Sequence, residues 1–357
     1  MIGFSGSYAP EDVTFLMKEV VIDGTDIENK EQHIKQGGHY SEVLTLENAP
    51  SPAYMALYRE VLDRNKTRFA KDVLQLASRI AADQPDEIVV VSLARAGTPV
   101  GVLLNRALNQ LLGRKAVHYC VSIIRDKGLD LNAVRHIVAQ HGYKGIVFVD
   151  GWTGKGVIGR ELSESVHALN QAEGWALSPN LYVVADIAGS AYFAATHDDY
   201  LLPSAILNST VSGLISRTVL TPAIKYMDFH GCVRYTHLES VDESQAFVDE
   251  VFAEMVALEL KAIAINDGSA TGCGASLLDA VQRYQTLYGI DNINLVKPGV
   301  GESTRVMLRR KPRLLVLREK DALEVQHLVF LANQREVPVL CDAALPCQAL
   351  ALIDHAD

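Results

Sequence analysis

Two hydrophobic patterns alternate along the first part of the chain. Apolar residues recur with helical spacing over residues 52–82, and short continuous apolar runs follow at 88–92, 117–124, 146–149 and 181–185. Such runs are typical of strands buried on both faces. Helical spacing returns between them, at 99–112, 131–141 and 154–169. This strand–helix alternation predicts an α/β fold with a parallel, doubly wound sheet.

The last hundred residues repeat the alternation on a smaller scale. We expect strands at 262–265, 293–295, 314–317 and 337–340, and helices at 275–287, 301–310, 322–333 and 344–353. Residues 228–242 show neither period, and the segment from Asp242 to Gln245 has the pattern of a capping box that opens a helix through Leu258. We therefore predict two domains, residues 1–230 and 242–357, the second a smaller α-β-α sandwich.

Composition and charge narrow the function classes. The 357 residues are 48% hydrophobic and 21% charged, which suits two globular domains, and the net charge of −10 argues against a general nucleic-acid binder. The five cysteines form no CxxC pair, so we expect reduced thiols and no metal site built from them. The N-terminus does not resemble a signal peptide, and no apolar run is long enough to span a membrane. We expect a cytoplasmic protein without a membrane partner, and the pattern does not predict its oligomeric state.

The candidate chemistry lies in the loops that follow the predicted strands. After the strand at 146–149 come Asp150 and the turn Thr153, Gly154, Lys155 and Gly156, which opens a helix. The backbone amides of such a turn, together with the helix N-terminus, bind anions, and Asp150 is placed to accept hydrogen bonds from sugar hydroxyls. An ordinary strand–turn–helix connection is the alternative. A nucleotide P-loop fits less well, because Gly156 stands where a Ser or Thr would hold magnesium.

Basic residues follow the two preceding strands. The segment Arg95, Ala96, Gly97, Thr98 comes after the first strand, and the second strand is followed by Arg125 and Lys127. An arginine fork suits phosphate oxygens, although each of these side chains alone is equally compatible with an ordinary surface role.

These three loops resemble those of type I phosphoribosyltransferases. The resemblance implies that 5-phosphoribosyl pyrophosphate (PRPP) binds with its ribose on Asp150, its 5′-phosphate on the turn Thr153–Gly156 and its pyrophosphate on the segment 95–98. It also implies Mg²⁺ as cofactor, an unidentified acceptor, and four catalytic residues: Asp150, Arg95, Arg125 and Lys127. The family's first acid is replaced here by Val149. This leaves a second hypothesis, in which the domain senses PRPP or a nucleotide without turnover.

Basic residues also gather near the C-terminus. Eight lie between Lys297 and Lys320, against only two acidic residues, and the turn from Gly299 to Glu302 opens a helix with Arg305 and Arg309 on one face. This segment resembles the RNA-contacting edge of Pelota/L7Ae-type domains. The resemblance implies RNA contacts from Lys297, Gly299, Gly301, Glu302, Arg305, Arg309 and Arg310. A solvated basic helix is the alternative.

The order of the two domains resembles a bacterial family of phosphoribosyltransferases with a C-terminal Pelota-like domain, found in tellurite-resistance and stress gene clusters. The resemblance includes residues 38–42 and 206–218, for which the sequence gives no mechanism. Relatives of that family carry a cysteine-protease label, for which Cys232 beside His230 and His237 is the candidate nucleophile. The leading hypothesis is a PRPP- and Mg²⁺-dependent transferase with an RNA-binding module. An RNA-binding stress factor without turnover comes second and a cysteine protease third.

Overall fold

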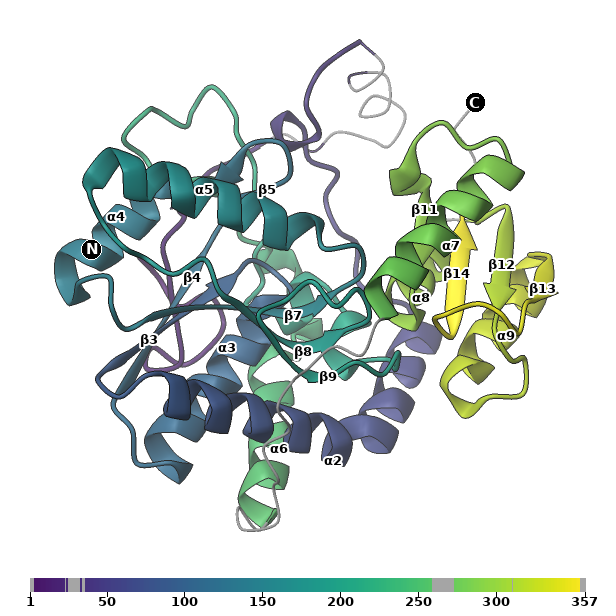
Figure 1. Cartoon of the computed structure of the whole chain (residues 1–357), viewed down its shortest axis with the longest axis horizontal. Helices are drawn as coiled ribbons and strands as arrows, with labels where there is room; N and C mark the ends of the chain where they lie inside the picture. Colours follow the sequence, from purple (N-terminus) through teal and green to yellow (C-terminus); the bar gives the residue numbers. More distant parts are fainter. Residues whose placement is uncertain are drawn as a thin grey trace.

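A six-stranded parallel sheet forms the centre of the chain (Figure 1). A computed structural model describes residues 3–22, 24, 33, 36–258, 273–309 and 311–353, with the backbone alone for residues 273–275 and Arg309. Every strand pairing within this sheet is parallel, which confirms the predicted α/β fold. The sheet contains the strands β1 (Thr14–Phe15), β4 (Ala116–Val121), β3 (Ile88–Leu93), β7 (Ile146–Thr153), β8 (Leu181–Asp186) and β9 (Phe193–Thr196), in that order.

Helices cover both faces of the sheet, as Figure 1 shows. One face packs against α4 (Leu131–His141) and α5 (Val157–Glu173). The opposite face packs against α2 (Pro52–Asp83) and α3 (Gly97–Arg106), and α3 continues as a π-helical turn over Ala107–Leu111. Because the strands are parallel, the loops after β3, β4 and β7 meet at one edge of the sheet. A two-stranded hairpin, β5 (Ile123–Ile124) and β6 (Gly128–Leu129), carries the loop after β4.

A second, smaller sheet of four strands follows near the C-terminus. Its order is β11 (Val296–Pro298), β14 (Ala349–Leu352), β12 (Leu314–Leu317) and β13 (Val339–Cys341). Its helices are α7 (Cys273–Leu287), α8 (Val300–Arg309) and α9 (Gln326–Arg335). The strand expected at 262–265 lies outside the described residues.

Two local predictions in this region are wrong. Residues 344–353 do not form a helix, since β14 pairs antiparallel with β11 and β12 and all four of its residues are buried. A short apolar run fits a buried strand as well as a buried helix, so the pattern alone could not decide. The segment 293–295 is a 3₁₀ turn, and the strand begins just after it, at Val296.

The helix after the predicted domain boundary packs on the first sheet's helices. It is α6 (Ser244–Ala257), and its Phe247 ring lies 5.9 Å from the Phe69 ring of α2. The expected capping box does not form, because the Gln245 side chain accepts a hydrogen bond from the amide of Ala9 instead, at 3.0 Å. The division into residues 1–230 and 242–357 stays a prediction. No helix in the described part of the chain has the length and apolar character needed to cross a bilayer.

Candidate active site

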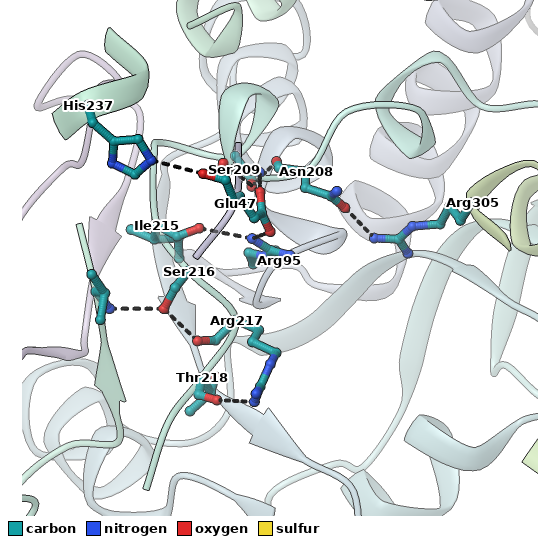
Figure 2. Close-up of polar contacts among 12 residues, drawn as sticks. Glu47, Arg95, Asn208, Ser209, Ile215, Ser216, Arg217, Thr218, His237 and Arg305 are labelled. Carbon is teal, nitrogen blue, oxygen red and sulfur yellow. Dashed lines mark hydrogen bonds and ion pairs between the residues drawn. The ribbon is translucent and has the colours of Figure 1, made fainter. Parts of the chain in front are cut away.

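The loop after β3 places Arg95 at the carboxyl edge of the sheet. There its guanidinium is paired with a carboxylate of the same chain, Glu47. The Arg95 guanidinium donates to Glu47 Oε1 at 2.7 Å and to the Ile215 carbonyl at 3.2 Å, and the side chain is only 13% exposed (Figure 2). Glu47 also accepts from the Ser209 hydroxyl at 2.7 Å. Burial acts to raise the pKa of Glu47, but Arg95 and Ser209 outweigh it and lower that pKa to about 2. The fork predicted to bind phosphate therefore holds a protein carboxylate.

Residues 206–218, whose role is not apparent from the sequence, lie around this ion pair. Ser209 holds Glu47, and Asn208 Oδ1 accepts a hydrogen bond from Arg305 of α8 at 2.9 Å (Figure 2). The Ser216 hydroxyl donates to the carbonyl of Arg217 and accepts from the Val233 amide. The segment thus links the first sheet's edge to the second sheet's helix α8.

The segment 38–42 lies beside the loop after β4. The Tyr40 hydroxyl accepts a hydrogen bond from the Arg125 amide at 3.1 Å, and the Arg217 guanidinium lies 5.4 Å from the Tyr40 ring. Burial is the main cause that lowers the pKa of Arg217, and the positive charge of Arg95 adds to it. Lys127 is exposed at the turn of the hairpin. Arg125 and Lys127 thus lie on one turn, with Arg125 half-buried against Tyr40 and Lys127 facing solvent.

β7 continues to Thr153, four residues beyond the predicted strand at 146–149, and protein groups hold its end and the turn after it. Asp150 is 9% exposed and accepts from the amide of Gly151 at 2.7 Å, and burial raises its pKa to about 7. The Thr153 hydroxyl donates to Asp186 at 2.7 Å. Gly156 adopts the left-handed conformation, φ 69°, at the start of α5, and its neighbour Gly154 lies in the same turn. Asp186 was not identified from the sequence, because it comes from a different strand end.

Lys155 reaches across to the second sheet. Its ammonium donates to the carbonyls of Ile293 at 2.9 Å and Val296 at 3.2 Å. Burial, and then the charges of Lys297 and Arg125, lower the pKa of Lys155 to about 8. This position of Lys155 therefore joins the two sheets.

The predicted RNA-binding turn faces the first sheet. The amide of Val300, between Gly299 and Gly301, donates to the Asp199 carboxylate at 2.8 Å, and Arg305 lies 5.3 Å from the Trp152 ring. Together with Trp152, Thr153, Gly154 and Asp199, the residues Pro298, Gly299, Gly301 and Glu302 line a cleft between the sheets. Arg310 lies outside the described residues, as does the side chain of Arg309. Loops of the first sheet cover this edge, and the predicted RNA contacts of its residues stay a prediction.

Among the residues that the structure describes, no imidazole is hydrogen-bonded to the candidate nucleophile Cys232. It lies in the strand β10 (Gly231–Cys232) and is fully buried, and burial raises its pKa. The His230 ring is hydrogen-bonded to the Ser122 hydroxyl at 2.8 Å, and the His237 ring to the Glu47 carbonyl at 2.9 Å. Neither ring is hydrogen-bonded to the Cys232 thiol, so the structure does not support Cys232 as the nucleophile.

A different thiol, Cys120 on β4, lies beside a serine that is hydrogen-bonded to an imidazole. Its sulfur lies 3.2 Å from the Thr98 hydroxyl in the first turn of α3, and Ser92 is its register partner on the neighbouring strand β3. The Ser92 hydroxyl lies 2.7 Å from His118 Nε2, while His118 Nδ1 lies 2.8 Å from the Asp12 carbonyl. A carbonyl only accepts, so Nδ1 carries the proton and Nε2 accepts one from Ser92. Sequence reasoning missed this cluster, because its members come from three different segments.

Comparison with known proteins gives a family for most of the chain. Residues 6–252 match the family described as "Tellurite-like stress resistance cysteine protease StiP", and residues 275–355 match the "PELOTA RNA binding domain". The chain is 40% identical over 364 residues to the protein named "Cysteine protease StiP" of Acinetobacter baylyi (strain ATCC 33305 / BD413 / ADP1), covering 98% of this chain and 94% of that protein.

Two solved structures are distant matches. Both concern an invariant aspartic acid in HPRTs, as an alanine and an asparagine mutant, and each is 14% identical to this chain. The TM-scores are 0.28 and 0.29, over 38% and 54% of this chain and 81% and 95% of the respective structures. Likeness this weak says nothing about the activity of this chain.

These matches correct the activity expected from the sequence. A phosphoribosyltransferase using PRPP is wrong, because both the family that covers residues 6–252 and the relative that is 40% identical are named as cysteine proteases. The expectation of Mg²⁺ came from the same resemblance and stays a prediction. The expected link to tellurite and stress resistance and the Pelota-like region are confirmed. The chain therefore belongs to the tellurite-like stress resistance cysteine protease StiP family, an enzyme family, and carries a PELOTA RNA binding domain after its StiP region.

Proposed function

We propose that the chain is a cysteine peptidase of tellurite-like stress resistance and that Cys120 is its nucleophile. The family and the relative that is 40% identical support a peptidase. The observation that carries the choice of residue is that Ser92, the register partner of Cys120 on β3, is hydrogen-bonded to His118. Of the four cysteines whose side chains the structure describes, Cys120 is the one tied to an imidazole in this way.

The relay accounts for each proton in peptide cleavage. The Cys120 thiol passes its proton to the Ser92 oxygen while the Ser92 proton moves to His118 Nε2. The thiolate then forms a bond to the substrate's carbonyl carbon. As the peptide C–N bond breaks, the proton returns along the same path to the leaving amine, and water hydrolyses the resulting thioester. The first turn of α3, with Thr98 against the sulfur, places the positive end of a helix where negative charge develops.

Cys120 and His118 are both uncharged at pH 7 in this conformation. Cys120 is fully buried, and burial raises its pKa to about 11, so about one thiol in ten thousand is ionised at pH 7. Burial lowers the pKa of His118 to about 4, so this imidazole is neutral and able to accept a proton. Cleavage therefore requires an opening that exposes the thiol to a substrate.

The N-terminal segment is the element whose displacement would expose it. Strand β1 is the edge strand next to β4, and the Leu16 amide donates to the Cys120 carbonyl at 2.9 Å. The buried Tyr8 belongs to the same segment, and burial followed by the charges of Asp242 and Cys120 raises its pKa. An edge strand only two residues long makes few ladder hydrogen bonds, which favours its local opening.

The test is cleavage of fluorescein-labelled casein by the full chain, in buffer and in mild denaturant. We expect Cys120→Ala to abolish cleavage. Ser92→Ala should reduce the rate by up to about 10²- to 10⁴-fold, the range that general base catalysis contributes. Cys341→Ala is the matched control, because Cys341 is exposed and lies on β13, away from the relay. Circular dichroism and melting curves show whether each variant is folded.

Two results would contradict the assignment. One is a folded Cys120→Ala variant that cleaves casein at the wild-type rate, above all if Cys232→Ala loses cleavage instead. The other is a wild-type chain that cleaves nothing in either condition.

We also propose that the C-terminal region binds RNA, which is supported by the match of residues 275–355 to an RNA-binding domain. Lys297 and Arg305 are the described cations predicted to contact phosphates. If they do, each replacement by Ala reduces the log–log slope of affinity against salt by about 0.7–0.9. Filter binding at several salt concentrations measures this slope, and an unchanged slope would remove these residues from the interface.

A further inference from the structure

The turn expected to contact RNA lies against loops of the first sheet. Gly299 has φ 93°, and a Cβ placed on it would lie 2.7 Å from Ile187 Cδ1 and 3.3 Å from Asp199 Oδ1. A Cβ on Gly301 would lie 4.0 Å from the Cβ of Ala205. The backbone of this turn is therefore in van der Waals contact with loops of the first sheet.

An aspartate occupies the start of α8. Asp199 Oδ1 accepts from the Val300 amide at 2.8 Å, and Oδ2 accepts from the Gln348 amide at 2.8 Å. Amides at a helix N-terminus bind anions, so the carboxylate stands where an RNA phosphate oxygen would be held. Burial raises the pKa of Asp199 to about 6, in keeping with a carboxylate that has left water.

The basic side chains of this edge are engaged as well. Arg305 donates to Asn208 and lies 5.3 Å from the Trp152 ring, and its Nη1 is 3.9 Å from Glu302. Lys297 Nζ is 3.8 Å from the other carboxylate oxygen of Glu302. Three of the contacted groups, Asn208, Trp152 and Asp199, come from the StiP region, so this region covers both the turn and the cations.

We propose that the StiP region inhibits RNA binding in cis, with Asp199 taking the place of an RNA phosphate at the start of α8. RNA then binds only after the second sheet separates from the first. The inference rests on the proposed RNA binding of residues 275–355. It adds that the closed chain and the RNA-bound chain exclude each other, so RNA captures an open form.

A disulfide across the contact tests this directly. The Cβ–Cβ distance of 4.0 Å between positions 205 and 301 lies inside the range of about 3.5–4.5 Å that disulfides need. The double variant Ala205→Cys with Gly301→Cys is made in the full chain with Cys341→Ala, so that no exposed thiol of the described residues competes. The probe is a fluorescein-labelled RNA hairpin with an internal loop, read by anisotropy at low salt.

We call the double-cysteine variant the lock. We expect its oxidised, disulfide-bonded form to bind the hairpin at least about tenfold more weakly than its reduced form, because apparent affinity scales with the open fraction. The two single-cysteine variants control for the redox treatment. Equal affinity of the oxidised and reduced lock would overturn the inference and leave RNA binding intact. If the reduced lock and the wild-type chain both fail to retain the hairpin, the RNA-binding proposal itself fails, whatever the disulfide yield says about docking.

A second variant works without new cysteines. Asp199→Ala removes the carboxylate from α8, and we expect tighter binding of the hairpin. Asp198→Ala is matched in charge, but Asp198 is exposed and pairs with Arg68 at 2.6 Å. If both variants shift the affinity equally, the effect is one of net charge, and the cis competition is refuted.

Discussion

Replacing Glu47 by Gln removes the charge that Arg95 and Ser209 hold at the carboxyl edge of the sheet. The amide keeps the size of the side chain and can still accept a hydrogen bond from Arg95. The change therefore tests the charge and not the packing. We expect a folded protein with a clearly lower free energy of unfolding at neutral pH.

The magnitude follows from the pKa of Glu47. Its value is lowered from 4.5 to about 2, which corresponds to about 3 kcal/mol of stability at pH 7 as an upper figure, because a quarter of the side chain is exposed. A depressed carboxylate pKa stabilises the folded state above the unfolded pKa. The contribution is lost as pH falls through the folded value, so about half of it remains at pH 3.

Urea unfolding of the wild-type chain and Glu47→Gln at pH 7 and pH 3 measures this difference. The matched control is Glu60→Gln, which removes a surface carboxylate, 66% exposed and 3.7 Å from Arg64, and should cost no more than about 1 kcal/mol at either pH. A Glu47→Gln effect as small as that of the control, or one that grows toward pH 3, would refute the reasoning.

Two further predictions concern packing and thiol chemistry. Gly97→Ala should destabilise the chain by about 1–3 kcal/mol, because the new Cβ would lie 2.7 Å from the Val149 carbonyl oxygen, a backbone atom. The control is Gly159→Ala, where the atom nearest to the new Cβ is 3.8 Å away. Equal melting temperatures of the two variants would contradict the prediction. Among the described cysteines, iodoacetamide should modify exposed Cys341 first and leave Cys120 unmodified in the native chain, as peptide mass spectrometry can show; equal rates would mean that Cys120 is not buried.

The sequence predicted the parts of the fold that depend on local pattern. Strands β3, β7 and β8 are continuous apolar runs, and α4 has the predicted bounds, Leu131–His141. Strand β14 was assigned as a helix because its four residues, with no turn signal inside them, fit either structure. The capping box failed because Gln245 found a distant partner, Ala9, which local spacing cannot reveal.

The sequence could indicate which loops meet, but not which side chains fill the space between them. The parallel topology placed the loops after β3, β4 and β7 together, as expected. Their partners Glu47 and Asp199 come from segments with no recognisable motif, so the sequence could not show that Arg95 and the turn at Gly299 are already occupied. For the same reason the sequence offered only Cys232 as a candidate nucleophile, since Ser92 lies beside Cys120 only once β3 and β4 are paired.

The central claim is that Cys120 is the nucleophile of a peptidase. Its most direct test is labelling of the full chain with a peptidyl acyloxymethyl ketone, a probe that alkylates catalytic thiols, followed by peptide mass spectrometry. The account predicts a label on Cys120 that appears when mild denaturant opens the N-terminal segment and that Ser92→Ala diminishes. A label on Cys232 or another cysteine with Cys120 unmodified, or a label on Cys120 that Ser92→Ala leaves unchanged, would contradict it.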